Sequence, residues 1–129
     1  MPSRRFAKTY DAACIYESVK EGRLVASEGN PETIMAGLNC GEANIFTFPV
    51  LRDFVHFFFK VPDCVTEKGM RALAAAGVVA GECGGIGTGL LLSLDDEKKE
   101  AMGIDENSVI LLFSTEGDTD PENYRRIVG

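Results

Sequence analysis

The chain has 129 residues, of which 45% are hydrophobic and 26% are charged, a balance typical of one globular domain with a core of ordinary size. Its net charge of −7 at pH 7 repels phosphate backbones and anionic lipids, so nucleic acids and membranes are excluded as preferred partners. No apolar run approaches the roughly 20 residues of a spanning helix, and the start of the chain does not resemble a signal peptide. We therefore expect a cytoplasmic protein with a single domain over residues 1–129.

The cysteines and the one histidine do not suggest a metal site. The cysteines form no CxxC pair, whereas structural zinc sites use closely spaced pairs of ligands. The sequence therefore predicts no metal, and in a reducing compartment such cysteines are usually small buried residues. His56 stands in an apolar stretch, where a packed histidine is the expected role. The four cysteines are Cys14, Cys40, Cys64 and Cys83.

Helix start and stop signals divide the first half of the chain. Residues 11–21 place apolar side chains on one helical face and end at Gly22, which favours a left-handed C-cap. An Asn-Pro pair predicts a second short helix over residues 30–41, and the same kind of start signal recurs at Thr47. Residues 54–61 are aromatic and β-branched, which is typical of a strand.

The second half alternates further strands and helices. The apolar run over residues 109–113 is uninterrupted, as in a central parallel strand that is buried on both faces. The predicted elements are a helix over 65–77, a strand over 78–80, a glycine turn over 81–89 leading into a helix through 90–92, an exposed helix over 95–102, a strand over 109–113 and a helix from Pro121.

This alternation predicts an α/β fold with a partial parallel sheet and helices on both faces. Only two or three strands are visible, fewer than the about five of a typical sheet. Such a piece would carry an unpaired edge and an exposed apolar face. We therefore expect a partner, either a second copy in a homo-oligomer or the missing part of the sheet.

Ligands of doubly wound sheets bind beyond the carboxyl ends of the strands, where this sequence has two candidate loops, residues 81–89 and 114–120. The glycines could leave backbone N–H groups free for a phosphate or carboxylate, or serve only a tight, closely packed turn. Glu82 could act as an acid, a base or a hydrogen-bond acceptor, or simply be solvated. The acidic residues near the end of the second loop lack the spacing of an EF-hand calcium site. A role as a helix cap explains Asp120 better.

Four blocks in this order resemble diaminopropionate ammonia-lyases, and the resemblance extends over nearly the whole chain. The last block is the most specific of the four. The blocks are residues 33–42 (TIMAGLNCGE), 68–71 (KGMR), 81–84 (GECG) and 113–121 (FSTEGDTDP).

The resemblance implies a C-terminal piece of the pyridoxal-phosphate fold of the tryptophan-synthase-β type. In that fold a serine or threonine after a late strand hydrogen-bonds the pyridine nitrogen, and Ser114 matches this position. A neutral hydroxyl partner leaves the pyridine unprotonated and a weaker electron sink, which suits β-elimination. By the same resemblance Glu82, Gly84 and Gly85 lie beside the cofactor ring.

The implied reaction eliminates ammonia from 2,3-diaminopropionate and gives pyruvate. The substrate would approach residues of the first block, and the resemblance assigns this side to Thr33, Met35, Ala36 and Gly37. The amino-acid substrate and pyridoxal phosphate are therefore the ligands expected for the complete enzyme.

The Schiff-base lysine, the phosphate loop and the catalytic aspartates of the family belong to its amino-terminal two thirds. None of the lysines here stands in a context that resembles the lysine motif, so the sequence nominates no catalytic residue. Cys83 occupies a position where serine is commoner in relatives. We expect a C-terminal portion that is inactive by itself.

Three alternatives remain open from the sequence. The chain could be a non-catalytic binding or oligomerisation remnant of the fold, which the absent lysine would suit. It could belong to a threonine or serine dehydratase, because these enzymes share the fold. An unrelated small α/β phosphate-binding module is disfavoured by the four ordered blocks.

Overall fold

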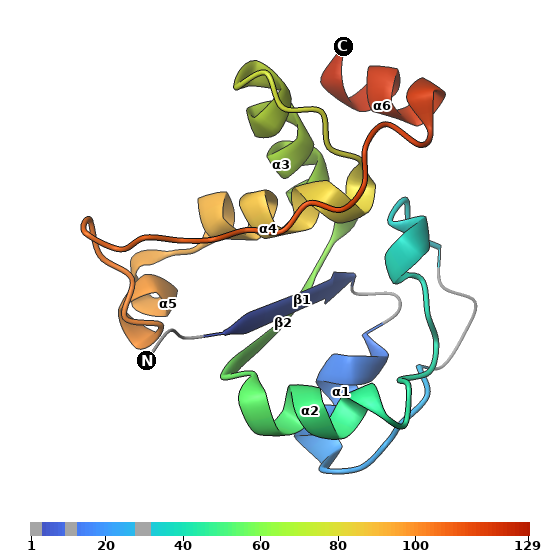
Figure 1. The fold of residues 1–129 in the computed structure, drawn as a ribbon, viewed down its shortest axis with the longest axis vertical. Helices are drawn as coiled ribbons and strands as arrows, with labels where there is room; N and C mark the ends of the chain where they lie inside the picture. Colours follow the sequence, from blue (N-terminus) through green and yellow to red (C-terminus); the bar gives the residue numbers. More distant parts are fainter. Residues whose placement is uncertain (1–3, 10–12, 28–31) are drawn as a thin grey trace. The chain divides into compact units, whose positions relative to one another are not determined.

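The computed structural model describes residues 4–9, 13–27 and 32–129 (Figure 1). They fall into two compact units, Met1–Asp63 and Cys64–Gly129, and each unit is described by itself. The first unit holds the sheet. The second consists of helices and the extended segment that joins two of them.

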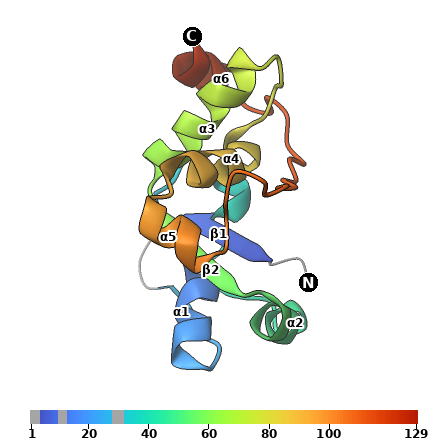
Figure 2. The same ribbon diagram turned by 90° about the vertical axis from the view of Figure 1, so that its left-hand side faces the viewer.

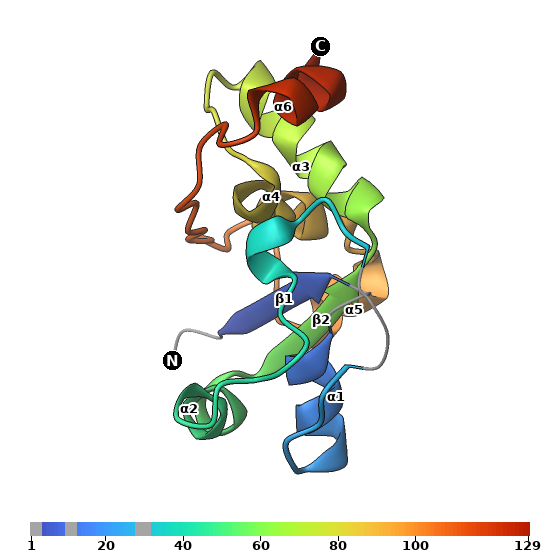
Figure 3. The same ribbon diagram turned by 90° about the vertical axis from the view of Figure 1, so that its right-hand side faces the viewer.

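The sheet of the first unit has two parallel strands, β1 (Arg5–Thr9) and β2 (Phe57–Val61), which lie side by side in Figure 3. Their register pairs Arg5 with Phe57 and Thr9 with Val61. The sequence did not predict β1, because its five residues carry two basic side chains and no apolar run. The parallel pairing itself agrees with the predicted fold class.

Helix α1 (Cys14–Glu21) confirms the first predicted helix, although residues 11 and 12 lie outside the described residues. It ends at Gly22, whose φ of 69° is the left-handed cap that the sequence predicted. The buried side of the helix includes Cys14 and Ser18. Burial of Ser18 is compensated, because its hydroxyl accepts a hydrogen bond from the backbone N–H of Val25 at 2.9 Å.

The helix predicted over residues 30–41 is wrong in its described part, which contains only the short 3-10 helix η1 (Ala36–Leu38). The Thr33 hydroxyl accepts the Met35 N–H at 3.1 Å, and Asp63 accepts the Ile34 N–H at 2.9 Å. These side-chain acceptors take backbone donors that a helix would use, which favours a turn.

Helix α2 (Thr47–Phe54) begins where the sequence predicted a helix start. The side chain of Asn44 accepts the N–H groups of Phe46 and Thr47 and so caps the first turn. Because the helix continues through Phe54, β2 begins only at Phe57 and not at residue 54 as predicted. His56 thus precedes the strand.

In the second unit, α3 (Asp63–Ala75) confirms its prediction, whereas α4 (Glu82–Ser93) corrects two others. Residues 78–80 form no strand, and the glycine run expected as a turn lies inside α4. Glycine here serves the contact between helices: a Cβ at Gly85 would lie 3.0 Å from the Thr66 carbonyl oxygen. One at Gly89 would overlap the Val65 carbonyl oxygen.

Helices α5 (Asp96–Ala101) and α6 (Pro121–Val128) both begin at predicted positions. The Asp120 side chain accepts the Asn123 N–H at 3.1 Å, which confirms its predicted capping role. Figure 2 shows α6 beside α3, where the guanidinium of Arg71 donates to the Ile127 carbonyl oxygen at 2.8 Å. Among the described residues, no helix is long and apolar enough to cross a membrane.

The predicted central strand over residues 109–113 is corrected by the structure. The segment is extended, but within the described residues it pairs with no strand. It is also exposed rather than buried, with Val109 at 98% and Phe113 at 82%. The physical reason is that the described part of the chain supplies no neighbouring strand for its backbone.

Candidate functional site

The loop after the extended segment is bound to the start of α4 by Glu116. Its carbonyl oxygen accepts the Gly81 N–H at 3.0 Å, and its carboxylate oxygen Oε2 accepts the Cys83 N–H at 2.8 Å. The other carboxylate oxygen accepts the Thr119 hydroxyl at 3.1 Å. The first turn of α4 therefore binds a carboxylate that belongs to this protein itself. The N–H group that it uses is not available for the phosphate or carboxylate that the sequence predicted at this turn.

Ser114 lies against this same turn. A Cβ at Gly84 would overlap the Ser114 hydroxyl oxygen and would come within 3.1 Å of the Glu116 carbonyl oxygen. Glycine at position 84 thus makes room for the serine side chain. Ser114 is exposed, and its hydroxyl has no hydrogen-bond partner among the described residues. The structure therefore brings Ser114 and Gly84 together, and no described residue uses the hydrogen-bonding capacity of the hydroxyl.

Glu82 is not a solvated loop residue, which was one of the roles that the sequence left open. It is 5% exposed, and its carboxylate accepts a hydrogen bond from the Asn123 amide of α6. Its carbonyl oxygen accepts the Thr66 hydroxyl of α3. A buried carboxylate requires such partners. Glu82 therefore joins α4 to both neighbouring helices at the turn that also meets Ser114.

Gly85 faces α3. A Cβ there would meet the Met70 Cγ at 2.8 Å and the Met70 backbone nitrogen at 3.1 Å. The requirement for glycine at this position follows from helix packing, so the packing interpretation of the glycine cluster is supported at Gly85. Its predicted place beside a cofactor ring stays a prediction.

The predicted substrate-side residues lie in the first unit. Asp63 fixes their turn, because one carboxylate oxygen accepts the Thr33 hydroxyl at 2.6 Å and the other accepts the Ile34 N–H at 2.9 Å. The Met35 side chain is fully buried, whereas Ala36 and Gly37 are exposed. A ligand would therefore meet the exposed turn and not the methionine side chain.

Sequence reasoning missed Glu116, Asn123 and Asp63. Glu116 lies in the fourth block but was given no role, and no motif marks Asn123, since each acts through a contact far away in the sequence. Asp63 carried no prediction of its own, and its acidic position in the first turn of α3 gave no indication that it would bind the turn at Thr33.

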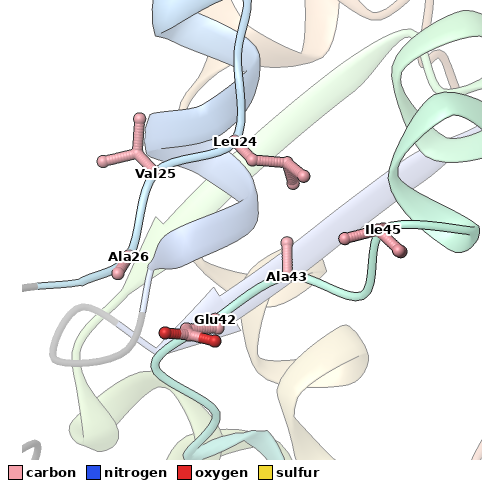
Figure 4. Close-up of a pocket in the computed structure, with 6 residues that line it drawn as sticks. All are labelled: Leu24, Val25, Ala26, Glu42, Ala43 and Ile45. Atoms are coloured by element: carbon pink, nitrogen blue, oxygen red, sulfur yellow. The ribbon is translucent and has the colours of Figure 1, made fainter.

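An open cleft of about 230 Å³ lies in the first unit, between two segments of its loops (Figure 4). The side chains that line it are apolar apart from one carboxylate, and no predicted site residue contributes to it. Figure 4 shows the carboxylate of Glu42 at one end and Ile45 at the other. The residues that line the cleft are Leu24, Val25, Ala26, Glu42, Ala43 and Ile45.

Comparison with known proteins identifies relatives along almost the whole chain, although no family model matches it. Diaminopropionate ammonia-lyase of Salmonella typhimurium is 37% identical over 99% of this chain. The Escherichia coli diaminopropionate ammonia lyase, in complex with an aminoacrylate-PLP azomethine reaction intermediate, superimposes with a TM-score of 0.87 at 34% identity over 96% of this chain. Maize serine racemase gives a TM-score of 0.80 at 25% identity over 95% of this chain.

The chain spans about a third of these proteins: 35% of the Salmonella enzyme, 33% of the Escherichia coli structure and 37% of the maize structure. The resemblance drawn from four sequence blocks is thus confirmed by identity along the chain and by the fold. The fold is a partial α/β fold of the pyridoxal-phosphate enzymes to which these relatives belong. Over the part that it spans, the chain is homologous to diaminopropionate ammonia-lyases.

Proposed function

We propose that this chain supplies the pyridine-nitrogen side of the cofactor site in a pyridoxal-phosphate-dependent lyase that eliminates ammonia from 2,3-diaminopropionate and gives pyruvate. One observation carries the proposal: the Ser114 hydroxyl, without a partner among the described residues, lies against Gly84 at the first turn of α4. Its relatives over this length are diaminopropionate ammonia-lyases.

The residues present fit the ring of pyridoxal phosphate. The Ser114 hydroxyl is neutral and exposed, so it can hydrogen-bond a pyridine nitrogen without protonating it. Gly84 makes room for the hydroxyl, and Glu116 fixes the loop that carries it. When bound, the cofactor supplies an electron sink for removal of the proton at the substrate α-carbon.

Glu82 holds the α4 turn in place through α3 and α6. We assign it, with Gly84 and Gly85, to the ring side of the site. The exposed part of the turn from Thr33 to Gly37, with the buried Met35 as its anchor, is assigned to the substrate side. The substrate amino acid, the cytoplasmic location and the single-domain organisation stay predictions.

The chain is proposed to be inactive until the other portion of the enzyme joins it, because no lysine here is a candidate for covalent binding of the cofactor. The experiment below also tests two other interpretations of the chain. A part of a threonine or serine dehydratase would act on a hydroxy amino acid. A non-catalytic remnant, or a homo-oligomer of this chain, would bind no cofactor in any context.

A chimera tests the proposal without requiring the isolated chain to form a site. The matching third of the Escherichia coli enzyme is replaced by this chain, and pyridoxal phosphate affinity and pyruvate release are measured. Ser114→Ala should weaken cofactor affinity about fivefold, as expected for a lost hydrogen bond of about 1 kcal/mol. Thr115→Ala is the matched control, since its hydroxyl has no partner among the described residues.

Equal cofactor affinity in the Ser114→Ala and Thr115→Ala chimeras would contradict the assignment of Ser114. Release of pyruvate from serine or of 2-oxobutyrate from threonine, with no pyruvate from diaminopropionate, would favour the dehydratase. A correctly folded chimera that binds no pyridoxal phosphate would support the non-catalytic remnant.

A further inference from the structure

The buried carboxylate of Glu82 depends on a single side-chain donor in the described part of the chain. Asn123 of α6 donates its amide Nδ2–H to the Glu82 oxygen Oε1. No basic side chain among the described residues pairs with Glu82, although the residue is only 5% exposed. Loss of the Asn123 donor would leave a desolvated carboxylate without a side-chain partner, which is unfavourable unless the carboxylate moves.

Arg126 fixes the direction in which the Asn123 amide points. The guanidinium Nε–H of Arg126 donates to the amide oxygen Oδ1 at 2.9 Å, so the NH2 end of the amide faces Glu82. Arg126 is itself held by α3, because its Nη2 lies 3.5 Å from Oε1 of Glu67. The second carboxylate oxygen of Glu67 pairs with Arg71 at 3.1 Å. The Asn123 amide therefore presents its donor, and not its acceptor, to α4.

Glu82 opens the turn of α4 that meets Ser114. Two residues further on, a Cβ at Gly84 would overlap the Ser114 hydroxyl oxygen. The hydrogen bond from the Gly85 N–H to the Gly81 carbonyl at 2.9 Å closes the turn around both residues, so they move together as one helical turn. A displaced Glu82 side chain would therefore shift Gly84 against the serine.

We propose that Asn123 is a positioning residue of the cofactor site, which acts through Glu82 and holds the first turn of α4 against Ser114. This inference rests on the proposed function and adds to it a residue of the last helix, which no sequence motif marks. The polarity of the pair is essential to it. Asn123 donates and Glu82 accepts, so an acid at position 123 would bring two carboxylates together and push the turn away.

The test uses the chimera that carries this chain in place of the matching third of the Escherichia coli enzyme. Asn123→Asp has the same size and keeps an oxygen for Arg126, but it removes the donor to Glu82. It should weaken pyridoxal phosphate affinity at least about tenfold, as expected for a lost hydrogen bond to a charged group. The absorption maximum of the bound cofactor should shift as well. The matched control, Asn107→Asp, changes an exposed side chain without a partner among the described residues.

A double variant with Asn123→Asp and Glu82→Gln restores the pair with the opposite polarity. The new amide at position 82 can donate to the new carboxylate at position 123, and the number of carboxylates in the pair is again one. Cofactor affinity and the absorption maximum should recover most of their original values. Urea unfolding of each variant separates the two roles, because a contact that only stabilises the fold would lower the midpoint and leave both cofactor readouts of the folded protein unchanged.

Unchanged affinity and absorption in Asn123→Asp would overturn the inference, as would a double variant that binds the cofactor as weakly as the single one. If Asn123→Asp does not fold, the double variant decides: recovered folding and cofactor binding support the pair, and their absence overturns it. A chimera that depends on Ser114 and not on Asn123 would refute this inference alone. Dependence on Asn123 without dependence on Ser114 would refute the proposed role of Ser114.

Discussion

The carboxylate of Glu116 accepts the backbone N–H of Cys83 at 2.8 Å, so a loop residue caps the first turn of α4 from a distance in the sequence. The ordinary N-cap position, Gly81, has no side chain for this purpose. Capping by an acidic group near a helix start satisfies a free donor and interacts favourably with the helix dipole.

Glu116→Ala should therefore lower the free energy of unfolding by about 1 kcal/mol, as measured by urea denaturation. The matched control is Glu106→Ala, which removes an exposed glutamate without a partner among the described residues. The control should change stability by less than about 0.5 kcal/mol. Equal losses in the two variants would show that Glu116 does not act as a cap.

The glycines of α4 should differ in their tolerance of a methyl group. Gly89→Ala would place a Cβ on the Val65 carbonyl of α3, and we expect destabilisation of about 1–3 kcal/mol from overpacking. Gly87→Ala meets only the movable Leu112 side chain at 3.3 Å. It should be neutral or stabilise the helix by about 0.5–1 kcal/mol.

Thermal and urea unfolding of the two glycine variants measure this difference. A fully stable Gly89→Ala protein would show that α3 and α4 do not pack as closely as their backbones indicate.

The ion pair between Glu17 and Lys60 should make stability depend on acid pH. Their 2.7 Å contact holds the pKa of Glu17 below its ordinary value of 4.5, chiefly through the hydrogen bond from Lys60. A folded-state pKa that is lowered adds stability above the ordinary value, and this contribution is lost as the pH falls through the folded pKa.

Glu17→Gln should accordingly cost about 0.5 kcal/mol at neutral pH, the size expected of a partly exposed pair. The difference from the unaltered chain should shrink as the pH falls below 4.5 and vanish once the pH has passed through the lowered pKa of Glu17. Urea unfolding as a function of pH measures it. A difference that stays constant over this range would mean that the charge of Glu17 does not contribute.

The helices with local signals could be predicted from the sequence. Gly22 marks the end of α1, and Asp120 followed by proline marks the start of α6. The same signal at the Asn-Pro pair predicted a helix that is absent from the described part, because the Thr33 hydroxyl and Asp63 compete for the backbone donors. A helix start signal in the sequence therefore does not guarantee a helix, because side chains can bind the same backbone donors.

The strands were harder to predict, because their stability lies in their neighbours. β1 has little apolar character and forms by pairing with β2, whereas residues 109–113 have the strongest strand composition and pair with nothing in the described part. Local composition cannot report whether a partner strand is present.

The candidate site was found only in part. The resemblance indicated Ser114 and Gly84, which the structure places in contact. Glu116 and Asn123, which hold the surrounding turn, act through contacts that no sequence spacing records.

The most direct measurement of the central claim compares the isolated chain with the chimera for pyruvate release from diaminopropionate in the presence of pyridoxal phosphate. The account predicts no pyruvate from the chain alone and turnover by the chimera that weakens with Ser114→Ala. Turnover by the isolated chain, with the cofactor bound to one of its own lysines, would contradict the claim that it supplies only one side of the site.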